Sequence, residues 1–385
     1  QFFNAEDDEI VFTQNTTESL NLVAYSYGMN FLHEGDEIVI SVAEHHSNMV
    51  PWQRVAQATG AKLVYMYPGE NGRLTTEDLD KKITPKTKVV AVAMVSNVLG
   101  LRAPVEEIVK RAHAVGAVVV LDCAQSAPHT PVDVKKLDVD FAACSAHKLY
   151  APMGVGALYA RAGLLEKMPP FMSGGDMIGA VHESGATWAD GPRKFEAGTR
   201  NVGGEVGFAA AIDYMKGIGW EAMETHEHAL LDRMLAGMRA MPWLTVYGEP
   251  VAEGRYGVVS FNVNDVPYKD EVDPDAENVT FALFTDNNSR IKKTYNGTGS
   301  ASNWWLRSPE ASSSSSFANV NNNGNSNNNN ASNSYGVAFG SSRARQSSFR
   351  SEIRAEWREG VLDLPAKVNI CPDASGRTLL AWYGL

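Results

Sequence analysis

Cysteine is scarce in this sequence of 385 residues, which contains only Cys123, Cys144 and Cys371. An odd number of cysteines spread so widely fits neither a disulfide framework nor the spacing of zinc ligands. No metal site is therefore expected. This cysteine usage is best suited to a reducing compartment.

Long hydrophobic runs and basic clusters are also missing. The longest apolar stretches, such as VVAVAMV and AVVVL, are far shorter than the roughly 20 residues of a membrane-spanning helix. The N-terminal stretch QFFNAEDDEI is polar and unlike a signal peptide. A formal net charge of −11, without a cluster of Lys or Arg, argues against a nucleic-acid partner. We therefore expect a soluble cytoplasmic protein with no membrane and no nucleic-acid partner.

Short β-branched runs alternate with amphipathic helical stretches from residue 9 to about 250. Several runs are apolar throughout, which suits strands of a sheet covered by helices on both faces. A helix is expected from Val105 to a cap at Gly116. The expected strands span 9–13, 36–42, 62–67, 87–95, 117–122, 139–144 and 155–160. This pattern predicts an α/β fold with a mostly parallel sheet between helices.

Polar residues follow several of these strands. Ligands of such sheets bind at the carboxyl ends of the strands. Thr16 and Thr17 open a helix after the first strand, where free N–H groups form either a phosphate seat or a simple N-cap. Four further strands lead to His45 with His46, to Asn97, to Asp122 with Gln125, and to Ser145 with His147 and Lys148. Five strand ends with such groups predict one shared site.

This set of side chains matches the needs of pyridoxal phosphate (PLP). A lysine that forms a Schiff base needs an aldehyde, and PLP also offers a phosphate, a ring nitrogen, a phenolic oxygen and a ring face. Asp122 would pair with the ring nitrogen, Gln125 would reach the phenolic oxygen, and His45 would stack on the ring. The phosphate would be held by Thr17, Ser145 and His147. Lys148 is therefore better explained as a cofactor anchor than as a surface charge.

Six motifs, in this order, resemble those of the class V aminotransferase family, and most closely those of the SufS-type cysteine desulfurases. They are EIVFTQNTTESLNLVAYSYG, EHHSNMVPWQ, SNVLG, LDCAQSAPH, SAHKLYAPMGVGALY and FEAGTRN. The resemblance covers about residues 1–265 and implies a PLP-dependent transferase of fold type I that is a homodimer. Such an enzyme takes sulfur from L-cysteine, leaves L-alanine, and passes a persulfide to a sulfur-acceptor protein for iron-sulfur cluster assembly.

The resemblance also implies roles for individual residues. Lys148 corresponds to the Schiff-base lysine and His45 to the ring-stacking histidine, and with Asp122 they form the expected catalytic set. Asp122 and Gln125 fall on the contacts to the ring nitrogen and the phenolic oxygen. Asn97 lies where the family helps to bind the substrate carboxylate. The phosphate contacts correspond to Thr17, Ser145 and His147, and to Thr199, which is given to the partner subunit's phosphate. A site shared in this way implies an obligate dimer.

Two departures from the family pattern bear on activity. A family member would begin some tens of residues earlier, with an N-terminal arm that helps to shape the substrate channel. After GVVSFNV the family has a loop resembling R-x-G-H-H-C, which supplies a nucleophilic cysteine and a carboxylate-binding arginine, and this sequence has no such loop. Cys371, in VNICPDASG, is the one downstream cysteine, and its surroundings do not match that loop. We therefore expect impaired turnover.

The composition changes sharply near residue 270. Asparagine provides 10 of the 15 residues from Asn319 to Asn333. Residues 278–340 resemble the C-terminal part of C-type-lectin-like domains found in variable proteins of diversity-generating retroelements, where such positions form a ligand-binding surface. A disordered low-complexity linker is the alternative interpretation of the asparagine-rich run.

The predicted organisation has four parts, in which an atypical C-terminal segment replaces most of the small domain. They are a PLP-binding large domain over 1–248 that lacks the N-terminal arm, a small-domain remnant over 249–270, a lectin-like Asn/Ser-rich fragment over 271–342, and a tail of unassigned role over 343–385. Three functions stay open: an impaired PLP-dependent cysteine desulfurase, an inactive PLP-fold scaffold, and a ligand-binding variable protein fused to a desulfurase domain. The complete cofactor set favours a desulfurase, whereas the missing loop favours lost turnover.

Overall fold

The computed structural model describes residues 2–242 and 244–263, together with eight short strands between residues 292 and 383. The chain divides into two compact units, Gln1–Ala240 with Val246–Ser260 and Met241–Thr245 with Phe261–Leu385. The predicted boundaries at 248, 270 and 342 stay predictions. Within the described residues, no helix combines the length and the apolar character needed to cross a membrane.

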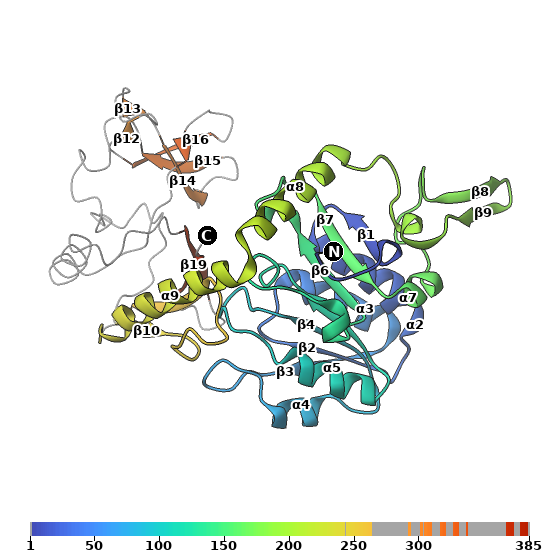
Figure 1. Cartoon of the computed structure of the whole chain (residues 1–385), viewed down its shortest axis with the longest axis horizontal. Helices are drawn as coiled ribbons and strands as arrows, with labels where there is room; N and C mark the ends of the chain where they lie inside the picture. Colours follow the sequence, from blue (N-terminus) through green and yellow to red (C-terminus); the bar gives the residue numbers. More distant parts are fainter. Residues whose placement is uncertain are drawn as a thin grey trace. The chain divides into compact units, whose positions relative to one another are not determined.

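The first unit is built on a seven-stranded sheet with the order β1-β7-β6-β5-β4-β2-β3 (Figure 1). Neighbours from β3 to β6 are parallel, whereas β7 is antiparallel to both β6 and β1. Its strands are β1 Ile10–Thr13, β2 Glu37–Ser41, β3 Lys62–Met66, β4 Thr87–Ala93, β5 Val118–Asp122, β6 Phe141–Ser145 and β7 Gly156–Ala160. The seven expected strands are therefore confirmed to within two residues at each end.

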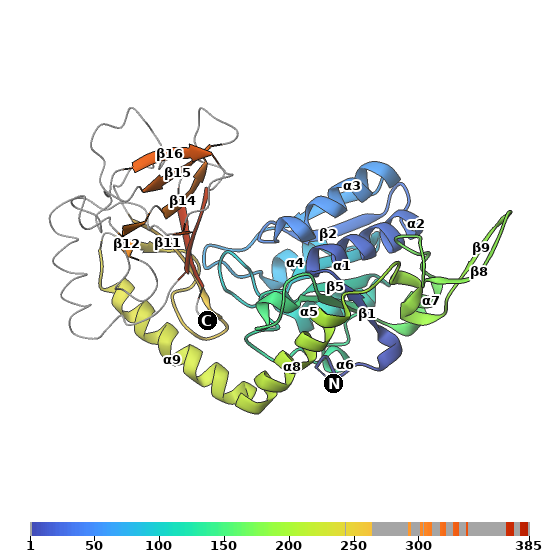
Figure 2. The same ribbon diagram turned by 90° about the horizontal axis from the view of Figure 1, so that it is seen from above.

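Helices cover both faces of this sheet (Figure 2). The α-helices are α1 Thr16–Leu22, α2 Met29–Phe31, α3 Val50–Thr59, α4 Thr76–Lys82, α5 Val105–Ala114, α6 Val134–Leu137, α7 Ala162–Lys167, α8 Val202–Ile218 and α9 Trp220–Arg239. Shorter helical turns are η1 Asp7–Glu9, η3 His46–Asn48, η4 Ala146–Lys148 and η5 Gly191–Phe195, and a π-helical stretch, η2 Val23–Gly28, follows α1. The predicted helix from Val105 is confirmed, with Gly116 at a φ of 76° just after its end.

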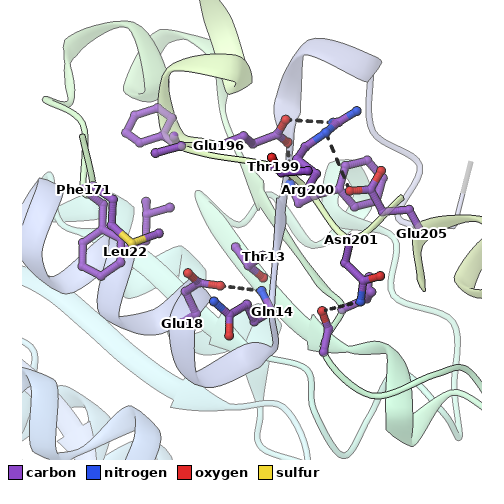
Figure 3. A pocket seen from close by; sticks show the side chains of 16 residues that line it. Thr13, Gln14, Glu18, Leu22, Phe171, Glu196, Thr199, Arg200, Asn201 and Glu205 are labelled. Atoms are coloured by element: carbon purple, nitrogen blue, oxygen red, sulfur yellow. Dashed lines mark hydrogen bonds and ion pairs between the residues drawn. The ribbon is translucent and has the colours of Figure 1, made fainter. Parts of the chain in front are cut away.

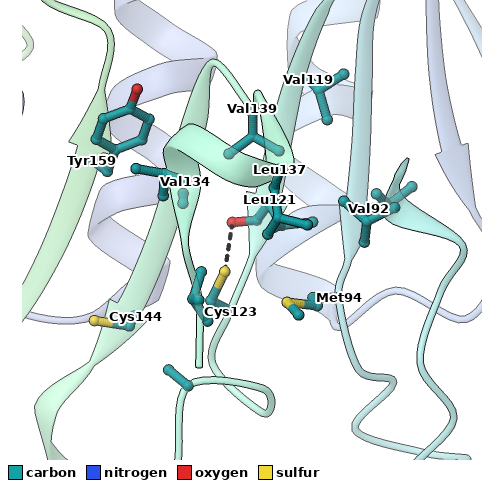
Figure 4. Packing of buried hydrophobic residues seen from close by; sticks show 14 of the residues in the cluster. Val92, Met94, Val119, Leu121, Cys123, Val134, Leu137, Val139, Cys144 and Tyr159 are labelled. Atoms are coloured by element: carbon teal, nitrogen blue, oxygen red, sulfur yellow. Dashed lines mark hydrogen bonds between the residues drawn. The ribbon is translucent and has the colours of Figure 1, made fainter. Parts of the chain in front are cut away.

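Alternate residues of the central strands feed two hydrophobic clusters, one on each face. On β5, Val119 and Leu121 join the cluster under α4, α5, α6 and α8, while Val120 joins the cluster under α1, α3 and α7. Figure 4 shows part of the first cluster, with Cys123 and Cys144 among its aliphatic side chains. Burial raises the pKa of Cys144 to about 12 and that of Cys123 well above its usual value. Both thiols are therefore protonated packing groups.

A two-stranded hairpin, β8 Ile178–His182 and β9 Gly185–Trp188, projects from the first unit (Figure 1). Every residue of its two strands is exposed. The hairpin includes large apolar side chains, since Val181 is 63% and Trp188 41% exposed. Isolated two-stranded hairpins with exposed apolar residues are marginal in water, so this one gains stability if another surface covers it.

The remaining strands lie mostly beyond residue 290, and the second unit contains all of them except residues 246 and 258–260. They are β10 Leu244–Val246, β11 Val258–Val263, β12 Lys292–Lys293, β13 Ala301–Ser302, β14 Trp304–Pro309, β15 Ser316–Val320, β16 Ser326–Asn330, β17 Gly336–Val337, β18 Lys367–Pro372 and β19 Thr378–Tyr383. The sheet orders are β10-β11-β19-β18, β12-β13 and β16-β15-β14-β17. Strands β15 and β16 pair antiparallel within the Asn/Ser-rich run, which therefore contains regular structure.

Candidate functional site

The carboxyl edge of the parallel strands gathers most of the predicted site residues. Strand β5 ends at Asp122 and β6 at Ser145, while the chain leaving β4 reaches Asn97 within four residues of Ala93. The chain leaving β2 reaches His45 in the same way. Because β2, β4, β5 and β6 are successive parallel neighbours, these four chain exits lie at one edge of the sheet.

Lys148 ends the short turn η4 directly after β6. Its backbone position is fixed on both sides, because the N–H of Ala146 donates to Val155 O (3.0 Å) and the N–H of Leu149 donates to Ala146 O (2.8 Å). The side chain is half-buried. Burial lowers the pKa of the Lys148 amine, and the nearby Asp122 carboxylate partly offsets this effect. A lysine in this environment is a better nucleophile at neutral pH than a surface lysine.

Asp122 is only 4% exposed and lies within electrostatic range of Lys148. The N–H of Ala124 donates to its Oδ1 at 2.8 Å. Burial raises the pKa of Asp122, whereas this hydrogen bond and the charges of Lys148 and His45 act in the opposite direction. A buried carboxylate of this kind is stable only beside a cationic partner.

His45 is held in one tautomer by its neighbours. The backbone N–H of Ser47 donates to its Nδ1 at 3.1 Å, and the Ser47 hydroxyl lies 3.0 Å from the same nitrogen. Because a backbone N–H can only donate, Nδ1 is an acceptor, and a neutral ring then carries its proton on Nε2. Burial lowers the pKa of His45, as do Lys148 and His46, while Asp122 raises it. The imidazole is therefore neutral and oriented.

The start of α1 is joined to the site at two points. The hydroxyl of Thr16 lies 2.7 Å from Ser145 Oγ, which also accepts the N–H of Thr16 at 2.8 Å. The hydroxyl of Thr17 lies 2.7 Å from Ser47 Oγ, the group that contacts His45. The predicted helix start is confirmed, and the two threonines connect the ends of three strands.

Gly156 makes this close approach possible. A Cβ atom at position 156 would lie 2.7 Å from both Asn15 Cα and Cys144 O. Only glycine allows β7 to pass this close to the start of α1 and the end of β6.

The remaining predicted residues divide into two groups. Gln125 is buried in the chain after Asp122, and His147 is exposed beside Lys148, where partial burial and the lysine charge lower its pKa. Thr199 lies elsewhere, exposed at a cavity of about 250 Å³ that Figure 3 shows. An ion pair of 2.9 Å between Arg200 and Glu196 borders that cavity. Lys148, Asp122, His45 and Ser145 do not line that cavity.

Sequence reasoning missed a buried polar ladder behind His45. The amide of Asn48 donates to Glu44 Oε2 at 2.7 Å, and Trp52 Nε1 donates to Asn48 Oδ1 at 3.3 Å. Burial raises the pKa of Glu44 to about 8, and the charge of Asp122 adds to this effect. The spacing of four residues was the one available signal, and it was weak because Glu44 lies in a bend, Asn48 in η3 and Trp52 in α3. The ladder fixes the segment that carries His45.

Together, the fold and the cluster define an α/β enzyme domain whose site lies at the carboxyl edge of a parallel sheet. The model of the family "Aminotransferase class-V" matches residues 1–273. The chain therefore belongs to the class V aminotransferase family.

Relatives with curated names are similar to the first two thirds of the chain. A probable cysteine desulfurase of Halalkalibacterium halodurans is 48% identical over 259 residues, which are 67% of this chain and 63% of that protein. A cysteine desulfurase of Haloferax volcanii is 44% identical over 259 residues, 67% of this chain and 61% of that protein. The chain thus spans less than two thirds of the length of these relatives.

Solved structures of the same kind have a similar fold. The apo structure of cysteine desulfurase from Thermococcus onnurineus aligns with a TM-score of 0.66 at 43% identity, covering 69% of this chain and 66% of that one. The cysteine desulfurase CsdA of Escherichia coli aligns with a TM-score of 0.65 at 39% identity and the same coverage. The predicted large-domain fold is confirmed.

A second family model, a domain of unknown function (DUF6273), matches residues 262–354. This match overlaps the predicted Asn/Ser-rich fragment over 271–342. Its description names neither a fold nor a ligand, so the resemblance to lectin-like variable domains stays a prediction.

The raised pKa of Glu44 predicts a pH-dependent stability. Between pH 4.5, its ordinary pKa, and pH 8, its folded pKa, the folded protein holds a proton that the unfolded chain has lost. The free energy of unfolding contributed by this group therefore falls as the pH rises through this range, by at most about 1.4 kcal/mol per pH unit. Glu44→Gln keeps an oxygen for Asn48 and removes the titration. Urea unfolding without added ligand should then show a weaker decline for the variant between pH 5 and 8.

The control for this prediction is Glu106→Gln. Hydrogen bonds from Arg102 lower the pKa of Glu106, so this carboxyl titrates below the tested range. The control should keep the slope of the unsubstituted protein. Equal slopes for the Glu44→Gln variant and the unsubstituted protein would contradict a buried, protonated Glu44.

Proposed function

We propose that this chain binds PLP and is a cysteine desulfurase whose turnover is impaired. The observation that carries the proposal is the placement of Lys148 beside the buried Asp122, with burial shifting the pKa of each group toward its neutral form. The family match over residues 1–273 and similarity to proteins named cysteine desulfurases over 259 residues support the same function. A further structural relative at 26% identity, a variant of C-DES, has glycine covalently linked to its PLP cofactor.

The donor set of the site fits PLP. Lys148 would hold the cofactor covalently through Nζ, and the buried Asp122 carboxylate would receive the cationic ring nitrogen that it needs as a partner. His45, fixed by Ser47, would present its flat face to the ring. The phosphate would lie near Thr17, Ser145 and His147, and the buried Gln125 would reach the phenolic oxygen.

When bound, PLP supplies an electron sink that stabilises negative charge at the Cα of an amino acid. The protein's own groups do the rest. Lys148 Nζ would take the Cα proton of L-cysteine, and its lowered pKa suits a general base. Asn97 would bind the substrate carboxylate, and Asp122 would keep the ring nitrogen protonated by its negative charge.

Sulfur removal requires one more participant. In the family pattern a cysteine thiolate attacks the substrate sulfur, from a loop that this sequence lacks after GVVSFNV. Transfer of a persulfide to a sulfur-acceptor protein, for iron-sulfur cluster assembly, would depend on that thiolate. We therefore propose weak turnover, and a catalytically inactive scaffold is the second candidate on the same observation.

A homodimer is also part of the proposal. Two exposed features of the first unit support it, namely the hairpin β8–β9 and the outer face of α8. The outer face of α8 exposes the apolar side chains Val202, Val206, Tyr214 and Ile218. A helix that is apolar on both sides is stabilised when another surface buries its exposed face. A second copy of the chain, which would also bring Thr199 to the phosphate, would provide that surface.

The first prediction from this proposal concerns the covalent anchor. Added PLP should give an absorbance band at about 410 to 420 nm, as expected for a lysine linked to the PLP aldehyde. Borohydride reduction followed by peptide mapping should then label Lys148. The variant Lys148→Ala should show no band, whereas Lys135→Ala, which removes an exposed lysine paired with Glu9, should be labelled normally. Labelling of another lysine in the unsubstituted protein would refute the assignment.

The second prediction concerns turnover. With PLP, L-cysteine and a reductant, the protein should release L-alanine and sulfide at a rate little or no higher than that of the inactive control Lys148→Ala. A thiolate must be held within roughly 3 to 3.5 Å of the sulfur to gain the advantage of positioning, and a free external thiol lacks it. Robust turnover that disappears in Cys371→Ser would overturn the proposed impairment.

A further inference from the structure

A segment of the first unit from Tyr247 to Ser260 packs against the turn that carries Asn97. Three successive carbonyls of that turn accept hydrogen bonds from this segment. The carbonyl of Val98 accepts the Ser260 hydroxyl, that of Leu99 accepts Arg255 Nη1 at 2.5 Å, and that of Gly100 accepts the N–H of Tyr256 at 2.8 Å. The carbonyl side of the turn is thus held by residues more than 150 positions away in the sequence.

The N–H side of the same turn is held locally. The N–H groups of Val98 and Leu99 each donate to Ser96 Oγ at 3.2 Å, and the N–H of Gly100 donates to Ser96 O at 2.9 Å. Ser96 therefore closes the turn from inside. Both sets of contacts thus hold the backbone of the three residues that follow Asn97.

Gly100 shows how closely the two segments approach. Its φ is +69°, and a Cβ atom at this position would lie 2.1 Å from Val258 O and 2.7 Å from Tyr256 O. No side chain fits between the turn and the 256–258 backbone. The contact is therefore built into the backbone of both segments.

Arg255 is the centre of the contact. Its side chain is 0% exposed, and its guanidinium donates to the carbonyls of Leu99 (2.5 Å), Glu249 (2.9 Å), Tyr247 (3.0 Å) and Val258 (3.3 Å). Burial lowers its pKa to about 10, so it remains a cation at neutral pH. Carbonyl dipoles from two separate segments solvate this cation, and the carboxylate of Glu249 instead pairs with Arg73 at 2.6 Å.

We infer that Arg255 is a positioning residue that orients Asn97 toward the carboxylate of the amino-acid substrate. The inference rests on the proposed function, in which Asn97 binds that carboxylate. Arg255 does not touch the substrate in this account. It fixes the carbonyl of Leu99, two residues after Asn97, and so restricts the turn to one conformation.

Arg255→Met tests the inference because it keeps much of the side-chain volume and removes the donors. Ser260→Ala is a milder second variant, which removes only the hydrogen bond to Val98 O. The matched control is Arg102→Gln. Arg102 lies next to the turn, but its guanidinium pairs with Glu106 at 2.7 Å, and its hydrogen bond to the segment, from the backbone N–H to Gly254 O, is kept in the variant.

The first measurement is amide hydrogen exchange of the full chain without ligand. The amides of Val98, Leu99 and Gly100 should exchange about tenfold or more faster in Arg255→Met and detectably faster in Ser260→Ala, because the carbonyl side of the turn is released. Arg102→Gln should leave their exchange unchanged. Unchanged exchange in Arg255→Met would show that Arg255 does not restrict the turn, whether or not the protein binds PLP.

The second measurement is the affinity of the PLP-loaded protein for L-alanine and for ethylamine, which lacks the carboxylate. Arg255→Met should weaken L-alanine binding by roughly tenfold to a hundredfold and leave ethylamine binding unchanged. Combined with Asn97→Ala it should cost little more than Asn97→Ala alone, because both act on one contact. A general structural defect would instead weaken both ligands and add to the effect of Asn97→Ala.

The two measurements separate failure of the inference from failure of the proposed function. If the protein takes up no PLP, the proposed function is refuted, and with it the substrate role of Arg255. The exchange data would still show whether Arg255 restricts the turn that carries Asn97. Normal PLP uptake, with the same L-alanine affinity in Arg255→Met and in the unsubstituted protein, would overturn the positioning role alone.

Discussion

The site depends on a pair of opposite charges held between two neighbouring parallel strands. Asp122 ends β5 and Lys148 follows the end of β6, so the sheet itself brings them together. Burial disfavours the charged form of each group, and each charge partly restores the other. Burying such a pair costs free energy in the cofactor-free protein. The arrangement becomes favourable when a cationic ring binds at the carboxylate and the amine is used for attachment. Contacts of Ser145 with Thr16 and of His45 with Ser47 hold the neighbouring chain segments in place.

Much of the fold followed from the sequence because its strands are short, β-branched and bounded by clear turn signals. Residues at the ends of parallel strands could also be grouped, since the topology brings His45, Asn97, Asp122 and Ser145 to one edge. Arg255 could not be predicted in this way. Its partner Leu99 is 156 positions away, and no periodic pattern records that the chain returns to the same edge. Glu44 was missed because burial, which is a three-dimensional property, gives it its raised pKa.

The chain joins two family matches that overlap between residues 262 and 273. The first contains all the residues that we propose to contact PLP, while the second begins where the desulfurase pattern would continue toward its nucleophile loop. The retained and the missing parts therefore act at different stages of the proposed reaction. In our proposal Lys148 and Asp122 act in cofactor attachment and on the Cα proton, whereas the thiolate of the family's loop would act on the sulfur atom. A protein that has the first groups and lacks the loop thiolate is expected to bind and activate its substrate better than it completes turnover.

The coupling between Asp122 and Lys148 is the central claim, and the pH dependence of PLP attachment tests it most directly. Only the unprotonated amine attacks the aldehyde, so the midpoint of the attachment rate against pH reports the pKa of Lys148. This midpoint should lie below the usual lysine pKa of 10.5, and lower still in Asp122→Asn, because the carboxylate that raises the pKa is gone. A midpoint at the usual value, or one that Asp122→Asn leaves unchanged, would contradict a buried and coupled pair.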